Sequence, residues 1–211
     1  MTGAGFTFHM PFPWYFWQMG SKGPPPNDGF LHGKFLIALP GMPDPRFERS
    51  VILMCAHSGE GAMGLIVNKP VDGIKIEQLM EKLGIQVTAP QIDTPVLFGG
   101  PVQTQQGLIL HSSEFSGIQS TSIIPEISLT GTMDVLHAIA AGRGPKKAAF
   151  ALGYAGWGAG QIEEELRGNG WVHCDADVEI LFEMPPDAKW SAALGKLGIN
   201  LSGLSSEAGR A

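Results

Sequence analysis

The sequence predicts an α+β fold with eight or nine short strands and about four helices. The first observation is that the expected strands come in runs and do not alternate with helices, which argues against a doubly wound parallel sheet. The second is size, because 211 residues with 44% hydrophobic residues suit one domain with a packed core. A sheet with so many short strands tends to curl or split, so we expect a curved sheet.

The first three expected strands are apolar runs at residues 34–39, 51–55 and 65–67. The loop between the second and third runs is rich in glycine and carries His57, Ser58 and Glu60. The third run ends at Asn68-Lys69-Pro70. Proline stops a central strand, so we expect the side chains of Asn68 and Lys69 to be exposed at a strand end.

The remaining elements follow from helical periodicity, capping residues and short apolar runs. One helix is expected over residues 133–141, after Thr132 as its N-cap, and a last helix is expected from Asp187 onward. The other expected helices are residues 74–83 and 159–167. The other expected strands are residues 96–98, 107–111, 123–129, 148–154, 171–174 and 178–182.

The composition excludes several classes of protein. The formal charge is −6, from 14 Lys and Arg against 20 Asp and Glu, and no long basic run is present, so we expect no direct DNA binding. Two cysteines do not make a disulfide scaffold, and Cys55 is interpreted as a small buried residue. No apolar run reaches the roughly 18 residues of a membrane span, and the N-terminus lacks signal-peptide features. We therefore expect a cytoplasmic protein.

The two ends of the chain differ from the rest. Residues 1–29 combine seven aromatic residues between positions 6 and 17 with clustered prolines, which block a regular helix or a central strand. Two interpretations stay open, a disordered extension or an aromatic segment that docks on a partner, on its own domain, at a membrane interface or on a second copy. Residues 30–200 are expected to form one domain, and residues 201–211 a frayed tail.

A glycine-rich segment at residues 153–161 is expected to run from a strand into the start of a helix. Backbone N–H groups at such a turn can bind an anion. However, the dinucleotide fingerprint fails because Gln161 occupies its sixth position, and no phosphate-loop motif is present. The alternative is structural, because glycines permit a tight turn and let Trp157 pack closely.

Histidine and serine give no local catalytic motif. His57 and His111 both follow apolar runs, where side chains often line clefts. Their spacing does not match a metal site, so we expect no metal and no cofactor. Ser58 lacks the context of a nucleophile elbow. The run Glu163-Glu164-Glu165 is interpreted as a solvated helix face, and Lys69 is the better candidate for an anionic ligand.

Taken together, these segments resemble the YqgE/AlgH family of bacterial proteins over residues 30–198. The matching segments include residues 35–40, residues 47–51, residues 61–70 after His57, residues 98–102, residues 110–112, residues 152–157 with Gly160 and Gln161, Asn169, Trp171 and residues 180–182. The resemblance implies a bifurcated β-sheet folded into a pseudo-barrel. Family members carry the label of transcriptional regulators, but the resemblance brings no catalytic residue and no cofactor. The sequence shows no helix-turn-helix with a basic recognition helix.

Two hypotheses for the function follow. The first is a non-enzymatic regulatory protein that acts indirectly, through a small molecule or a protein partner. The second is a small-molecule site, or an enzyme, for a phosphorylated or nucleotide-like ligand. The candidate ligand-binding residues lie at expected strand ends and turns, and they are Asn68, Lys69, Gly99, Gly100, His111, Gly156, Trp157 and Gln161.

Overall fold

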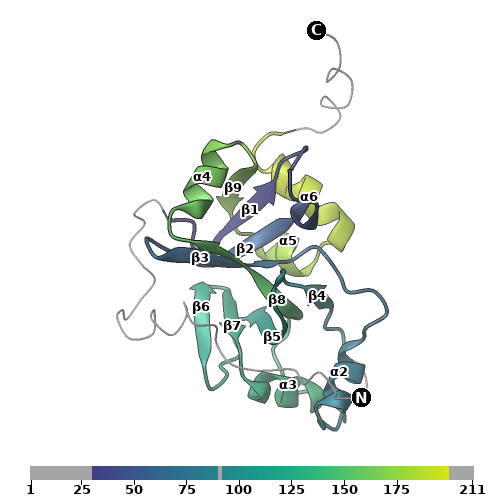
Figure 1. Ribbon diagram of the computed structural model, residues 1–211. Helices are drawn as coiled ribbons and strands as arrows, with labels where there is room; N and C mark the ends of the chain where they lie inside the picture. The colour runs from purple at the N-terminus through teal and green to yellow at the C-terminus, as the bar shows by residue number, and fades with distance from the viewer. Residues whose placement is uncertain (1–29, 90–91, 200–211) are drawn as a thin grey trace, which may run out of the picture.

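The computed structural model describes residues 30–89 and 92–199, and within them it confirms the α+β class with nine strands, five α-helices and one 3-10 helix (Figure 1). The strands are β1 (Lys34–Ala38), β2 (Val51–Ser58), β3 (Gly61–Ile66), β4 (Val96–Phe98), β5 (Val102–Ser112), β6 (Ser120–Ile124), β7 (Ile127–Thr130), β8 (Ala148–Gly158) and β9 (Trp171–Asp175). The helices are η1 (Pro45–Phe47), α2 (Ile76–Lys82), α3 (Met133–Ala140), α4 (Gln161–Arg167), α5 (Val178–Phe182) and α6 (Pro186–Gly195). None of the helices in the described ranges is long and apolar enough to cross a membrane.

Strand β8 joins the two halves of one sheet, whose order is β6-β7-β5-β8-β3-β2-β1-β9 with β4 also beside β8. The first part of β8 pairs with β5 and β4, whereas residues 155–158 pair with β3. Just before the change of partner, at an irregularity in the pairing with β5, lies Gly153, whose φ of 70° is in the left-handed region that favours glycine. The sheet is therefore bifurcated along β8 and curled, which confirms the expected pseudo-barrel.

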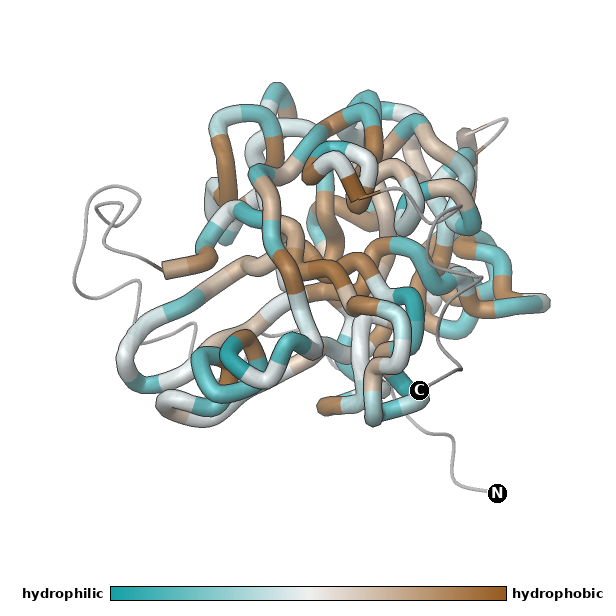
Figure 2. The backbone as a smooth tube through the Cα atoms, turned by 90° about the horizontal axis from the view of Figure 1, so that it is seen from above, coloured by the Kyte–Doolittle hydropathy of each residue, from teal (hydrophilic) through white to brown (hydrophobic). Residues whose placement is uncertain are grey.

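The core consists of three apolar clusters, one inside the curl and one on the outer side of each half of the sheet. We call β1, β2, β3 and β9 the upper half of the sheet and β4 to β7 the lower half, as they lie in Figure 1. The inner cluster brings Leu53 and Leu65 of the upper half together with Leu110 and Leu129 of the lower half and with α5 and α6. The two outer clusters place α4 against the upper half and α2 and α3 against the lower half. Figure 2 shows the same arrangement, with apolar segments gathered in the middle of the molecule.

Two expected loops are largely strand. Strand β2 continues to Ser58 and strand β3 begins at Gly61, so that only residues 59 and 60 form the turn between them. His57 therefore lies within a strand. Residues 153–158 also belong to β8, and only residues 159–160 separate that strand from α4. In both places pairing with a neighbouring strand overrides the high glycine content, because the glycines allow the close approach of β3 and β8.

The expected strand at residues 178–182 is wrong, because these residues form helix α5. The β-branched and aromatic composition of this segment favours a strand. However, the Asp177 side chain caps the first turn by accepting from Glu179 N–H and Ile180 N–H, at 2.9 and 3.2 Å. The expected strand at residues 123–129 is in fact the hairpin of β6 and β7.

Candidate functional site

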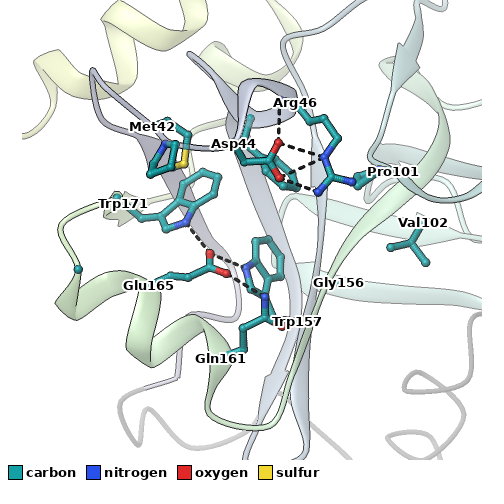
Figure 3. A pocket seen from close by; sticks show the side chains of 14 residues that line it. Met42, Asp44, Arg46, Pro101, Val102, Gly156, Trp157, Gln161, Glu165 and Trp171 are labelled. Carbon is teal, nitrogen blue, oxygen red and sulfur yellow. Dashed lines mark hydrogen bonds and ion pairs between the residues drawn. The ribbon is translucent and has the colours of Figure 1, made fainter.

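A pocket of about 490 Å³ lies where four separate segments meet beside the upper half of the sheet (Figure 3). The segments are the chain around η1, the start of β5, the end of β8, and α4 with the residues that follow it. We call this site the tryptophan pocket. It is lined by Met42, Pro43, Asp44, Arg46, Phe47, Pro101, Val102, Gly156, Trp157, Gln161, Glu165, Gly168, Gly170 and Trp171. Its volume is in the range of small-molecule sites.

Three aromatic rings form one wall of the pocket. Trp157 from β8 and Trp171 from β9 are 7% and 3% exposed, and their ring centroids are 6.2 Å apart at an angle of 80°. Phe47 packs against Trp171 at 5.6 Å and against Trp157 at 6.4 Å. Offset and edge-to-face arrangements of this kind are favourable. The wall is therefore a packed cluster and not a loose set of side chains.

The carboxylate of Glu165 in α4 holds both tryptophans in place. Its Oε2 accepts from Trp157 Nε1–H at 3.0 Å and from Trp171 Nε1–H at 2.9 Å. Its Oε1 accepts from Gln161 Nε2 at 2.9 Å, and Gln161 Oε1 accepts from Gly158 N–H at 3.0 Å. Buried indole N–H groups need an acceptor, and one carboxylate serves both. This network ties α4, β8 and β9 together on the pocket side, as Figure 3 shows.

Asp44 and Arg46 form the charged rim of the pocket. Asp44 caps η1, and Arg46 donates from Nε and Nη2 to the Asp44 carboxylate at 2.6 to 3.1 Å. The side-chain hydrogen bond from Arg46 is the main reason why the pKa of Asp44 is lowered. Within the described part of the chain, the Arg46 Nη1 has no hydrogen-bond partner. The guanidinium lies between Asp44 and Pro101 in Figure 3.

Three of the candidate residues from the sequence, Gly156, Trp157 and Gln161, line the tryptophan pocket. Gly99 and Gly100 lie just before Pro101, and they bring the chain against β8. A Cβ atom on Gly100 would lie 2.1 Å from the backbone carbon of Tyr154, so glycine is required for this close approach. Whether any of these residues binds a ligand stays a prediction.

Asn68 and Lys69 do not line the pocket but hold the chain that forms its rim. The Asn68 side chain accepts from Val51 N–H and donates to Arg49 O, both at 2.8 Å. Lys69 Nζ donates to Arg46 O at 2.7 Å, and partial burial lowers the pKa of this lysine. Their side chains therefore satisfy backbone groups around η1, instead of being free at a strand end as the sequence suggested.

His111 lies in the other half of the molecule, at the far end of β5 from Val102. Nine residues of strand correspond to roughly 30 Å. His111 Nδ1–H donates to Ser112 O at 3.0 Å, and Nε2 lies 2.9 Å from Thr130 Oγ1. Burial is the main cause that lowers the pKa of His111. The structure thus separates His111 from the other candidate residues.

His57 and Cys55 are buried side chains with structural roles. His57 is 3% exposed, its Nδ1 accepts from Leu31 N–H at 2.9 Å, and its Nε2–H donates to Glu163 Oε1 at 2.8 Å. Burial raises the pKa of the Cys55 thiol to about 12, so a reactive thiolate is excluded there. Among the described residues, no three His, Cys, Asp or Glu side chains are grouped to hold a metal.

Sequence reasoning missed the charged and acidic part of the pocket. Asp44, Arg46 and Phe47 lie between the first and second expected strands, where no element was expected, and the glutamate run in α4 was interpreted as a solvated face. In the structure only Glu164 of that run is exposed, since Glu163 and Glu165 accept from His57 and from the two indoles. A usable signal was present, because Gln161 and Glu165 are four residues apart on one helix face and two buried tryptophans require acceptors.

Comparisons with known proteins agree on one family. A family model described as AlgH-like matches residues 35–202. A UPF0301 protein of Bradyrhizobium diazoefficiens is 51% identical over 196 residues, covering 89% of this chain and 92% of that protein. A UPF0301 protein of Rhodospirillum rubrum is 46% identical over 185 residues, covering 88% and 96%.

Two solved structures have a similar fold. The solution structure of the AlgH protein from Pseudomonas aeruginosa has a TM-score of 0.71 and 42% identity, and the match covers 90% of this chain and all of that one. The crystal structure of a Corynebacterium diphtheriae protein has a TM-score of 0.62 at 20% identity, over 86% and 92% of the two chains, which shows the fold alone. From the family model and these relatives, the chain belongs to the AlgH-like family.

Proposed function

We propose that this protein binds a small molecule in the tryptophan pocket and acts as a non-enzymatic regulatory protein of the cytoplasm. The observation that carries the proposal is the pocket itself, where residues from four distant segments converge around one cavity of about 490 Å³. Ligand sites are typically concave, largely apolar and fitted with a few fixed polar groups. The tryptophan pocket has each of these properties.

The polar groups of the pocket are held in place before any ligand arrives. Glu165 and Gln161 are fixed by three hydrogen bonds from Trp157, Trp171 and the end of β8 and by one hydrogen bond between them. The Asp44 carboxylate fixes the plane of the Arg46 guanidinium. A preformed site loses less conformational entropy on binding, which supports recognition of a defined ligand.

The side chains of the pocket favour binding over catalysis. Among the described residues, the lining contains no Ser, Thr, Cys, His, Lys or Tyr side chain, so this part of the chain supplies neither such a nucleophile nor a histidine base. The two carboxylates are engaged, Asp44 with Arg46 and Glu165 with the indoles. A ligand therefore meets a recognition surface made of aromatic, aliphatic and paired polar groups.

A regulatory role would be indirect. The formal charge of −6 and the acidic side chains of α4 disfavour contact with a phosphate backbone. We propose that ligand binding changes how the protein engages a protein partner, and that the protein itself does not bind DNA. A gel-shift titration in low salt is expected to show no specific complex with promoter DNA, and a specific, salt-sensitive complex would contradict this part of the proposal.

A second candidate function is an enzyme or binding protein for a phosphorylated or nucleotide-like ligand. One observation favours it, which is the Arg46 Nη1 group at the rim of the pocket. Guanidinium groups are well suited to phosphate oxygens. Catalysis would require a reactive group from outside the pocket lining.

The test is a thermal-shift screen with a metabolite library that includes nucleosides, nucleotides and neutral aromatic compounds, followed by calorimetry on the hits. A ligand in excess of its dissociation constant raises the unfolding temperature. Gly156→Val should abolish the shift, because Gly156 lines the pocket and a valine side chain would fill part of it. The fold should tolerate the change, since a Cβ atom at this position would lie 3.4 Å from its nearest neighbour, Tyr154 Cε2.

Gly158→Val is the matched control, since Gly158 is also exposed on β8 but does not line the pocket. The proposal fails if no compound shifts the unfolding temperature, or if Gly156→Val and Gly158→Val affect the shift equally. Hits confined to phosphorylated compounds that depend on Arg46 would favour the second candidate.

A further inference from the structure

Strand β9 ends the sheet with a free edge. Its register with β1 pairs Lys34 with Asp175 and Ala38 with Trp171, and the flanking bonds are Leu39 N–H to Gly170 O and Ala176 N–H to Gly33 O. In an antiparallel ladder the bonded pairs alternate, so Val172 and Cys174 face β1. The N–H and C=O groups of Trp171, His173 and Asp175 therefore point outward. No other strand in residues 30–89 and 92–199 pairs with this edge.

A groove of about 480 Å³ runs along this edge. It is lined by Leu166, Trp171, Val172, His173, Leu197 and Ile199. Leu166 belongs to α4 on one face of the sheet, whereas Leu197 and Ile199 follow α6. The groove thus has a floor of unpaired backbone donors and acceptors and walls that are largely apolar. Such a site fits an extended peptide that adds a strand and buries apolar side chains beside it.

The chain itself contains a sequence with the pattern that such a site requires. Between residues 6 and 16 every even position is apolar, namely Phe6, Phe8, Met10, Phe12, Trp14 and Phe16. Strand side chains alternate between two faces, so this pattern would present one continuous apolar face. Pro11 and Pro13 both lie at odd positions. If the backbone N–H and C=O groups of the even positions point toward β9, those of the odd positions point away from it. Both prolines then occupy positions whose N–H group would make no bond to β9.

The described chain starts at Phe30, whose ring packs against His57 of β2 at 4.8 Å, and it reaches the end of β9 at Gly33. Gly33 O accepts from the residue that follows β9, Ala176, at 3.2 Å. From residue 30 back to residue 16 the chain can span up to roughly 46 Å, at about 3.3 Å per residue. The five residues of β9 extend over only about 17 Å. The sequence between residues 16 and 30 is therefore long enough to reach either end of β9.

We propose that the free edge of β9 and its groove bind residues 6–16 of the same chain as an added edge strand. This choice selects the docking interpretation of the N-terminal segment over a disordered extension. It is independent of the tryptophan pocket, although Trp171 lines both sites. The segment would cover the apolar groove walls.

The test is hydrogen exchange of the Trp171, His173 and Asp175 amides, measured by NMR in the full-length protein. We expect these amides to exchange about tenfold or more slowly than in the double variant Phe8→Asp/Phe12→Asp, which places charges on the apolar face. The matched control is Thr7→Asp/His9→Asp, which adds the same charge at odd positions and should leave exchange unchanged. His173→Pro, which removes one outward N–H, should accelerate exchange at Trp171 and Asp175, whereas His173→Ala should not.

Protection of Val172 and Cys174 reports whether β1 and β9 stay paired in each variant. The proposal is overturned if the three outward amides exchange at the rate of exposed loops in the unmodified protein, or if both double variants behave alike. It is also overturned if protection depends on protein concentration, which would indicate a second copy. Loss of protection in Leu201→Asp/Leu204→Asp, with no effect of Phe8→Asp/Phe12→Asp, would instead assign the groove to the C-terminal residues.

Discussion

The two halves of the molecule use buried polar groups in different ways. In the upper half, Glu165 accepts from two indoles and Gln161, and this network faces the tryptophan pocket. In the lower half, His111 contacts Thr130, Thr130 contacts Ser120 at 2.6 Å, and Ser120 Oγ accepts from Gly117 N–H at 2.8 Å. The second network starts and ends on backbone groups, and none of its residues lines the tryptophan pocket.

The proton positions in the lower network follow from chemistry alone. Ser112 O only accepts, so His111 carries its proton on Nδ1, and its Nε2 then accepts from Thr130. Thr130 in turn accepts from Ser120. Every group has its partner, and the network serves to join β5, β6 and β7. The comparison teaches that a buried histidine is weak evidence for a site, whereas a carboxylate shared by two tryptophans beside a cavity is stronger evidence.

The largest expected effect is on the upper network. Glu165→Leu leaves two buried indole N–H groups without an acceptor, and we expect a loss of about 4 kcal/mol in the free energy of unfolding. Urea denaturation measures this loss, and ligand binding should disappear as well. Glu164→Leu is the control, because Glu164 is exposed on the same helix. Equal stability of the two variants would show that the indole bonds contribute little.

A smaller effect is expected in the lower network. Thr130→Val removes the hydroxyl between His111 and Ser120 in a fully buried position, and should cost about 2 kcal/mol. Thr130→Ser keeps the hydroxyl and should cost less, so denaturation of both variants separates the hydrogen bonds from the packing. Ligand binding in the tryptophan pocket should not change. A change in affinity with Thr130→Val would mean that the two halves are coupled.

The pH dependence of stability distinguishes the halves further. Burial lowers the pKa of His111 in the folded state, although Glu114 and Asp134 act in the opposite direction. Below the ordinary value of 6.5 the unfolded chain therefore binds more protons than the folded chain, and stability falls as the pH falls. Compared with His111→Gln, the unmodified protein should lose stability between about pH 6.5 and 5. A pH-independent difference between the two proteins would contradict the burial of this histidine.

The sequence predicted the elements that have local signals, and it missed those decided by long-range contacts. Thr132 marked the start of α3, and the apolar runs marked β1 and β9. In contrast, the extension of β8 through Gly156 and Gly158 depends on pairing with β3, which no local pattern encodes. Helix α5 depends on the Asp177 cap and on packing of Ile180 and Leu181 in the core.

The candidate site was predictable only in part, for the same reason. Gly156, Trp157 and Gln161 are neighbours in the sequence, so one motif revealed all three. Asp44 and Arg46 belong to the pocket because the chain around η1 packs beside the end of β8. Along the sequence they are more than a hundred residues away from Gly156, Trp157 and Gln161. Asn68 and Lys69 looked free at a strand end, but their partners are the backbone groups of residues 46, 49 and 51.

The smallest effect on stability is expected for Arg46, which is exposed at the rim of the pocket. Its ion pair with Asp44 is a surface pair, and such pairs contribute little to folding. Arg46→Ala should therefore leave the unfolding midpoint unchanged, while it weakens any ligand that accepts a hydrogen bond from the guanidinium. Arg46→Lys keeps the charge but loses the planar donor geometry, so calorimetry with both variants shows whether charge or geometry matters. Full affinity in Arg46→Ala would show that the ligand makes no use of a cation, because Arg46 is the one cationic side chain among the described residues that line the pocket.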